Sequence, residues 1–143
     1  MLLRIPVSLL GVALAGSALS LAACGQCPEA PAGASISIVS PARVGSGGPS
    51  EMDEIAGVVK GVKPAEARVV LYAHAGDRWW IQPLEDAPFT AITSKLAWSS
   101  RIHSGFEYAA LLVHRDYSPP KQPMQLPQTG GCVWAVDIAK GHN

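Results

Sequence analysis

Three cysteines carry the most reactive side chains of this 143-residue chain. Cys24 and Cys27 lie close together near its start, and Cys132 lies near its end. A thiol can take a covalent lipid, form a disulfide or bind a metal. The Cys-x-x-Cys spacing is formally a redox motif, but no strand-helix-strand pattern surrounds it. We therefore expect these cysteines to serve attachment and cross-linking.

The other polar residues form no recognisable catalytic motif. HExxH, GxSxG and Walker sequences are all missing from the chain. Glu85 and Asp86 are adjacent, so in a strand their carboxylates point to opposite faces, and the neighbours His103 and Ser104 do not by themselves make a triad. The four histidines are isolated in the sequence, as His74, His103, His114 and His142. We predict a protein that is not an enzyme and that holds no metal or other cofactor.

The first 23 residues have the composition of an export signal. Arg4 precedes an apolar run from Val7 to Ala15, and small residues follow. This run is too short and too rich in Gly and Ser for a membrane-spanning helix, which needs about 20 apolar residues. We expect residues 1–23 to be removed on export and no later segment to span a bilayer.

The four residues Leu21-Ala22-Ala23-Cys24 resemble the lipobox of bacterial lipoproteins. The resemblance implies cleavage before Cys24, its modification by acyl chains such as palmitate, and attachment to a membrane of the cell envelope. Gly25 stands where an Asp usually retains lipoproteins in the inner membrane, which favours the outer membrane of a Gram-negative bacterium and exposure to the periplasm. The alternative is an ordinary secretory cleavage site with a chance cysteine.

Charge and length limit what the exported chain can be. Removing residues 1–23 leaves 120 residues, enough for one domain and a tether. Arg4 is the one basic residue of the signal, so 10 basic residues remain against 11 acidic ones. No basic stripe is present, and we therefore expect no nucleic acid among the partners.

Lipidation of Cys24 would leave Cys27 and Cys132 as an even pair in an oxidising compartment. A disulfide between them would close a loop of about 105 residues. The alternative places Cys27 in a flexible tether and leaves Cys132 as a buried thiol. Residues 24–34 are rich in Pro and Gly, so we expect them to carry the lipid and form a flexible linker.

Residues 35–143 have the pattern of an all-β domain organised around a hairpin at 68–83, whose two apolar strands meet at a Gly-Asp turn. Further strands are expected at 35–40, 54–62, 89–92, 96–99, 106–114 and 132–139. No segment reads as a convincing helix. We predict an immunoglobulin-like or fibronectin-like β-sandwich of about seven strands. The proline-rich residues 118–127 should cross the surface between the two sheets, or alternatively serve as a polyproline ligand.

Several short stretches of the domain resemble a small Trp-containing β-sandwich module of secreted bacterial proteins, some of which are carbohydrate-active. The stretches are LYAHAGDRWWIQP, PFTAI, Trp98, YAALL and YSPP, within residues 36–139. No activity is assigned to that module, so the resemblance supports the fold alone. The module is expected to carry Gly-x-Trp before its third Trp, whereas this chain has Leu96-Ala97-Trp98.

Aromatic residues are the best candidates for a binding site. Alternation in the return strand of the hairpin puts Trp79 with Ile81 in the core and leaves Trp80 partly exposed. Three aromatics with one polar neighbour could form a platform for sugar rings, namely Trp80, Tyr72, Trp98 and Gln82. For any one of these aromatics, a place in the core is the more frequent role.

Two functions follow from these observations. The first is a lipid-anchored, non-catalytic module of the cell envelope that binds protein partners through a sheet face or edge. The second is a carbohydrate-binding module for peptidoglycan or a surface glycan. Glycan binding predicts exposed, coplanar aromatics, whereas protein binding predicts an unprotected edge strand or an apolar patch.

Overall fold

A computed structural model describes residues 26–143 and contains only strands and loops there. The export signal and Cys24 lie outside these residues. The strands are β1 (Ser35–Ser40), β2 (Met52–Lys60), β3 (Ala67–Ala75), β4 (Arg78–Gln82), β5 (Phe89–Thr90), β6 (Ala97–His103), β7 (Glu107–His114) and β8 (Val133–Lys140). The predicted all-β class is confirmed, with eight strands in place of about seven.

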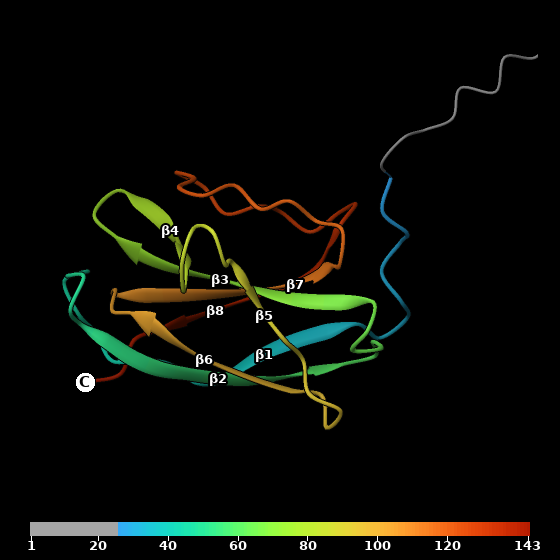
Figure 1. The fold of residues 1–143 in the computed structure, drawn as a ribbon, viewed down its shortest axis with the longest axis horizontal. Helices are drawn as coiled ribbons and strands as arrows, with labels where there is room; N and C mark the ends of the chain where they lie inside the picture. Colours follow the sequence, from blue (N-terminus) through green and yellow to red (C-terminus); the bar gives the residue numbers. More distant parts are fainter. Residues whose placement is uncertain (1–25) are drawn as a thin grey trace, which may run out of the picture.

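The strands form two antiparallel sheets that face each other (Figure 1). One sheet has the order β1-β2-β6, and the other has the order β4-β3-β7-β8 with β5 paired to β3. The chain changes sheets between β2 and β3, between β5 and β6, and between β6 and β7. These crossings and the three antiparallel pairs of consecutive strands, β1-β2, β3-β4 and β7-β8, give the connectivity of an immunoglobulin-like or fibronectin-like sandwich.

Apolar side chains from both sheets fill the space between them. The inward residues of β2, β3, β6 and β7 alternate with outward ones, as the pleat of a strand requires. The largest is Trp98, which lies against Gly57 of the neighbouring strand β2. A Cβ at Gly57 would lie 2.3 Å from Cζ2 of Trp98 and 2.0 Å from the carbonyl oxygen of Ser37. Only glycine lets the indole pack this closely.

A second apolar cluster covers the outer face of the larger sheet. It contains residues of β3, β4, β7 and β8, packed against side chains of the β7–β8 connection such as Tyr117 and Leu126. Both faces of β3 and β7 are apolar, so the outer face must be covered as well as the inner one. The prediction that residues 118–127 cross between sheets is therefore wrong. They join two neighbouring strands of one sheet and lie over its outer face.

The same proline-rich connection also protects the edge of β4. The backbone N–H of Trp79 donates to the carbonyl of Pro123 at 2.9 Å, and that of Ile81 donates to Lys121 at 3.0 Å. Proline has no N–H to donate, but the carbonyls of this segment can still accept. The segment thus occupies the edge of β4 that would otherwise be open to another strand.

Several element boundaries differ from the predictions, most of all those of β2, β5 and β6. β2 begins and ends two residues earlier than expected, and β6 continues through residues 101–103, where a loop was expected, because its pairing with β2 extends to the Met52–His103 pair. The turn before β6 holds Leu96 at a φ of 59°, in the left-handed region that glycine favours. Leu96 thus adopts the conformation that the expected Gly of a Gly-x-Trp turn would take.

Tyr108 ties the start of β7 to two loops. Its hydroxyl donates to the carbonyl of Arg43 and accepts from the N–H of Gly105 at 2.9 Å. Burial raises the pKa of Tyr108, so the hydroxyl keeps its proton and can donate. The arrangement matches the tyrosine corner of Greek-key sandwiches.

We expect Tyr108→Phe to lower the free energy of unfolding by about 1 to 3 kcal/mol, because it leaves two backbone groups without partners while filling the same space. Chemical denaturation monitored by fluorescence measures the change. Tyr117→Phe is the control, since it makes the same change at a tyrosine that is partly buried and whose hydroxyl has no hydrogen bond within residues 26–143. Equal losses in the two variants would contradict the assigned role of Tyr108.

Candidate functional site

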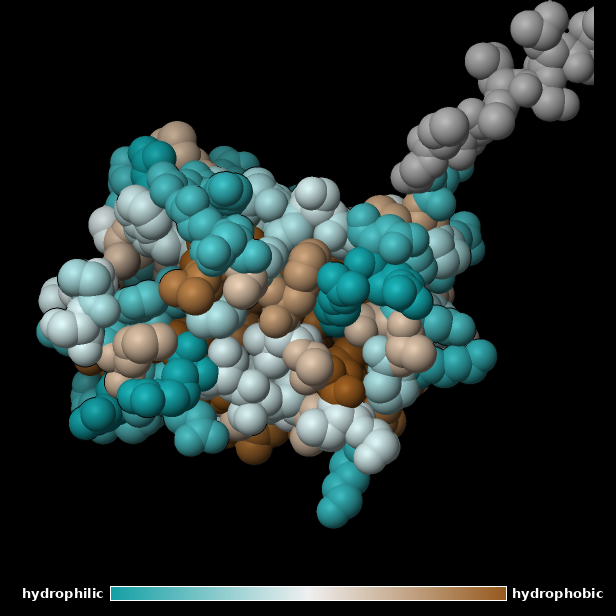
Figure 2. Space-filling view, in the orientation of Figure 1, coloured by the Kyte–Doolittle hydropathy of each residue, from teal (hydrophilic) through white to brown (hydrophobic). Residues whose placement is uncertain are grey.

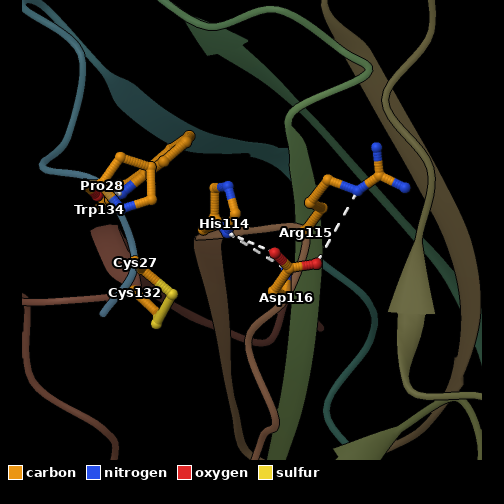
Figure 3. Close-up of a disulfide and its surroundings, with 7 residues drawn as sticks. All are labelled: Cys27, Pro28, His114, Arg115, Asp116, Cys132 and Trp134. Atoms are coloured by element: carbon orange, nitrogen blue, oxygen red, sulfur yellow. Dashed lines mark hydrogen bonds and ion pairs between the residues drawn. A yellow bond between two sulfur atoms is a disulfide. The ribbon is translucent and has the colours of Figure 1, made fainter. Parts of the chain in front are cut away.

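The disulfide between Cys27 and Cys132 is present, with 5.0 Å between the two Cα atoms. Figure 3 shows it beside Pro28 and Trp134, at the end of the sandwich where β7 ends and β8 begins. The indole N–H of Trp134 donates to the carbonyl of Pro28 at 3.1 Å. The segment expected to be a flexible linker is thus joined to the domain at Cys27 and Pro28.

The predicted aromatic platform is not formed. Tyr72 and Trp98 are 0% and 1% exposed, so neither can stack on a ligand at the surface. Tyr72 pairs with Ile81 whereas Trp80 pairs with Ala73, which places Tyr72 and Trp80 on opposite faces of the sheet. The Tyr72 hydroxyl donates to the carbonyl of Pro120 at 2.7 Å under the proline-rich connection. Burial raises the pKa of Tyr72 strongly, so this donor stays protonated.

The two neighbouring tryptophans differ in exposure as the alternation predicts. Trp79 is 7% exposed and Trp80 is 39% exposed. The partners of Trp79 are nevertheless different from those expected, because it belongs to the outer cluster and stacks on His74 with 4.4 Å between ring centroids. Trp80 lies on the side of the sheet that faces β6, and its N–H donates to the carbonyl of Ala75 at 3.1 Å. Part of the Trp80 side chain thus remains open to solvent.

A groove of about 290 Å³ lies beside Trp80. Its lining combines apolar side chains with polar groups: Gly47, Pro49, Trp80, Ile81, Gln82, Pro83, Leu84, Glu85, His103 and Lys121. A smaller hollow of about 140 Å³ adjoins it and shares four of these residues. At the rim, Glu85 is held in place by Lys121 at 3.7 Å and by the amide of Gln122 at 2.9 Å. The groove can therefore offer an aromatic surface together with hydrogen-bonding groups. In the view of Figure 2, small groups of apolar side chains are visible among hydrophilic ones on this face of the molecule.

Gln82 holds the two sheets together at this groove. It is only 4% exposed, and its Oε1 accepts from the backbone N–H of His103 at 3.0 Å. The Nδ1 atom of His103 lies 3.1 Å from the same oxygen. Gln82 thus acts as a buried bridge between β4 and β6 rather than as an exposed ligand contact. Sequence reasoning did not connect it with His103, because the two residues belong to different sheets.

Each of the four sheet edges carries a group that limits further pairing over part of its length. The proline-rich connection occupies the edge of β4, and the Asp137 carboxylate accepts the outward N–H of Ile38 on β1 at 2.8 Å. At the edge of β6, Thr93 and Gln82 bind the backbone at the two ends of the strand. Within residues 26–143, β8 forms a backbone ladder only with β7, but β1 lies close to it, and just beyond its end the backbone of His142 is hydrogen-bonded to Ala42 and Val44.

Along β8 itself, three residues carry backbone groups that point away from β7. Gly141 donates to Phe106 at one end of the β7–β8 pair and His114 donates to Cys132 at the other, which fixes the alternation of the ladder. The N–H and C=O groups of Val136, Ile138 and Lys140 therefore point away from β7. The side chain of Ile138 is 51% exposed and lies beside these groups.

The histidines are far from converging on one site. His74 lies 3.3 Å from Glu107, His114 lies 3.7 Å from Asp116, and His142 lies 3.9 Å from Asp53. Among residues 26–143, no group of three or more His, Cys, Asp or Glu side chains is arranged to hold a metal ion. In the same range, no helix is long and apolar enough to cross a membrane.

Comparison of the chain with protein-family models, with curated proteins and with solved structures found no match. The class of protein is therefore defined by the fold and by the surface features described above. The chain contains a disulfide-linked β-sandwich domain with immunoglobulin-like connectivity, one half-exposed tryptophan in a groove, and a strand β8 with outward backbone groups at Val136, Ile138 and Lys140.

Proposed function

We propose that this protein is a lipoprotein of the bacterial cell envelope, anchored through Cys24 and without catalytic activity, whose sandwich binds an extended segment of a partner protein along β8. The outward backbone groups of Val136, Ile138 and Lys140 carry the proposal. Backbone groups of an edge strand bind a peptide strand by adding it to the sheet, and neighbouring side chains select its sequence. Val136 and Ile138 supply an apolar row for this purpose, and Lys140 supplies a charge.

The groups that cover the other sheet edges bear on the choice of β8 as the binding strand. An unpaired edge invites aggregation, and proteins usually block it with a charge, a proline or a covering segment. This chain blocks β1, β4 and β6 in these ways, with Asp137, the proline-rich connection, and Thr93 with Gln82. On β8, residues 42–44 bind the backbone only beyond the end of the strand, at His142, so the outward groups of Val136, Ile138 and Lys140 stay available to a peptide strand.

Site-specific photo-crosslinking in living cells tests the proposal. A photoreactive residue at Lys140 should yield one discrete adduct, while the same residue at Val58 should yield none, because Val58 is exposed on the central strand β2. Ile138→Pro removes only an outward N–H, which an edge strand tolerates. It should reduce the adduct about tenfold, as expected for loss of one backbone hydrogen bond and a steric block.

Ile138→Ala is the matched control for the proline variant, since it shortens the side chain but keeps the N–H. A smaller reduction is expected there than with proline. Equal adducts from Lys140 and Val58, or an adduct that Ile138→Pro leaves unchanged, would rule out binding along the edge of β8.

The groove beside Trp80 supports a second candidate, the binding of a glycan such as a peptidoglycan fragment. A sugar ring stacks on an exposed indole face, and Glu85 and Lys121 stand close enough to bind its hydroxyl groups. Only one aromatic is available, which makes this candidate weaker than a platform of several rings would.

Fluorescence of residues 26–143 during titration with peptidoglycan fragments tests the glycan candidate. Trp80 is the one exposed tryptophan among these residues, so binding there should shift the emission to shorter wavelength in a saturable way. Trp80→Ala should abolish the shift, and Trp80→Phe should retain part of the affinity because stacking is worth about 0.5 to 1.5 kcal/mol. A shift that persists in Trp80→Ala would place the glycan elsewhere.

A further inference from the structure

The disulfide limits how far the domain can move from its anchor, if Cys24 carries the lipid as proposed above. Cys27 is bonded to Cys132 at the end of the sandwich, and only Gly25 and Gln26 separate it from Cys24. Three residues of fully extended chain span at most about 11 Å. An open linker of residues 24–34 would reach about three times as far. The disulfide end of the domain must therefore stay close to the membrane surface.

This end is built from the loops between β2 and β3 and between β7 and β8. Figure 3 shows His114, Arg115 and Asp116 beside the Cys27–Cys132 bond. The N–H of Arg115 donates to the carbonyl of Glu66 at 3.0 Å, which brings the β2–β3 loop to the same end. A bilayer below the disulfide would therefore meet both loops.

Basic side chains outnumber acidic ones at this end. The basic residues are Lys60, Lys63, Arg68, Lys95 and Arg115, and the acidic ones are Glu29, Glu66 and Asp116. At the opposite end, basic Arg43, Arg78, Arg101 and Lys140 face acidic Glu51, Asp53, Glu54, Asp77 and Glu107. The end nearest the anchor thus carries the positive excess, although the chain as a whole is nearly neutral.

Two arginines at this end line a shallow hollow of about 240 Å³. The guanidinium of Arg68 lies over the ring of Phe89, 4.7 Å from its centroid, which holds the side chain in place with its N–H groups free at the edges. Within residues 26–143, no carboxylate lies within salt-bridge distance of Arg68, and Asp116 reaches Arg115 only at 4.0 Å. A phosphate group is the natural anionic partner for two guanidinium groups.

We infer that the disulfide end of the domain docks on the lipid head groups of the membrane that holds Cys24, with Arg68 and Arg115 contacting lipid phosphates. The short tether keeps the disulfide end of the domain near the membrane, and the excess of basic side chains at that end turns it toward the lipid head groups. In this orientation the groove beside Trp80 lies toward the far end of the sandwich, away from the bilayer, where a partner can reach it.

Hydrogen exchange of the lipidated protein tests this inference. The mature protein is reconstituted into phosphatidylcholine vesicles with and without phosphatidylglycerol, and its intact mass first reports whether Cys24 is acylated. Exchange of the backbone amide hydrogens of residues 61–66 and 115–117 should slow when the anionic lipid is present. The exchange rates of residues 43–51 should not change. Arg68→Gln/Arg115→Gln should lower the docking constant about 25-fold, at about fivefold for each arginine near an anionic surface.

The matched control is Arg78→Gln/Arg101→Gln, which removes the same charge from the far half of the domain and should leave the protection unchanged. An unacylated Cys24 would overturn the proposed anchor and this inference together. An acylated protein in which both ends exchange alike, or in which the two double variants behave alike, would overturn the docking alone and leave the proposed function standing.

Discussion

Replacing Cys27 and Cys132 together by alanine is expected to lower the free energy of unfolding of residues 26–143 by about 4 to 5 kcal/mol. The disulfide closes a loop with a sequence separation of 105 residues, and the entropy lost by the unfolded chain grows with loop length. Domains of this size are stable by about 5 to 15 kcal/mol, so the variant should be close to unfolding at body temperature. Denaturant titration of the variant and of the oxidised wild type measures the difference.

Reduction of the wild-type disulfide provides the control for this experiment. It opens the same loop without changing any side chain beyond the two thiols, so it should reproduce the loss seen in the double variant. A loss below about 1 kcal/mol in both would mean that the unfolded chain is already compact enough to hold its ends together. The contact between Trp134 and Pro28 should then be examined as the main attachment of residues 27–34.

Substitution of Trp98 by alanine should cost about 3 to 5 kcal/mol, because it removes the largest buried side chain between the two sheets. Trp98 projects from β6 and packs over Gly57 of its neighbour β2, and the backbone pairing of these two strands limits how far the cavity can close. The expected measurement is a shift of the denaturation midpoint with an unchanged slope. A slope that also changes would show that the variant no longer unfolds in two states.

Trp98→Phe is a second variant that separates the effect of the indole N–H from the loss of packing. The indole N–H of Trp98 is the one buried side-chain polar atom within residues 26–143 without a hydrogen-bond partner. An unpaired buried donor costs about 1 to 3 kcal/mol, and its removal offsets part of the packing loss in phenylalanine. We therefore expect Trp98→Phe to retain most of the stability. A loss equal to that of alanine would indicate that the N–H has a partner, such as a buried water.

The aromatic residues show where sequence reasoning succeeded and where it failed. Alternation correctly separated Trp79 from Trp80, because neighbours in a strand point to opposite faces. It could not place Tyr72 or Trp98 at the surface or in the core. Both faces of β3 are apolar, and nothing local tells which face another segment will cover. The proline-rich connection covers the face with Tyr72, and the second sheet covers Trp98.

The sequence by itself determined the all-β class and the partial exposure of Trp80, and it gave the pairing of Cys27 with Cys132 as one of two alternatives. These properties depend on strand periodicity, on cysteine number and on neighbours within one strand. Only the tertiary structure decided which edges are blocked, that Gln82 bridges to His103, and that Arg68 and Arg115 meet near the disulfide. Those contacts join residues far apart in the chain, and their geometry depends on the path of the whole backbone.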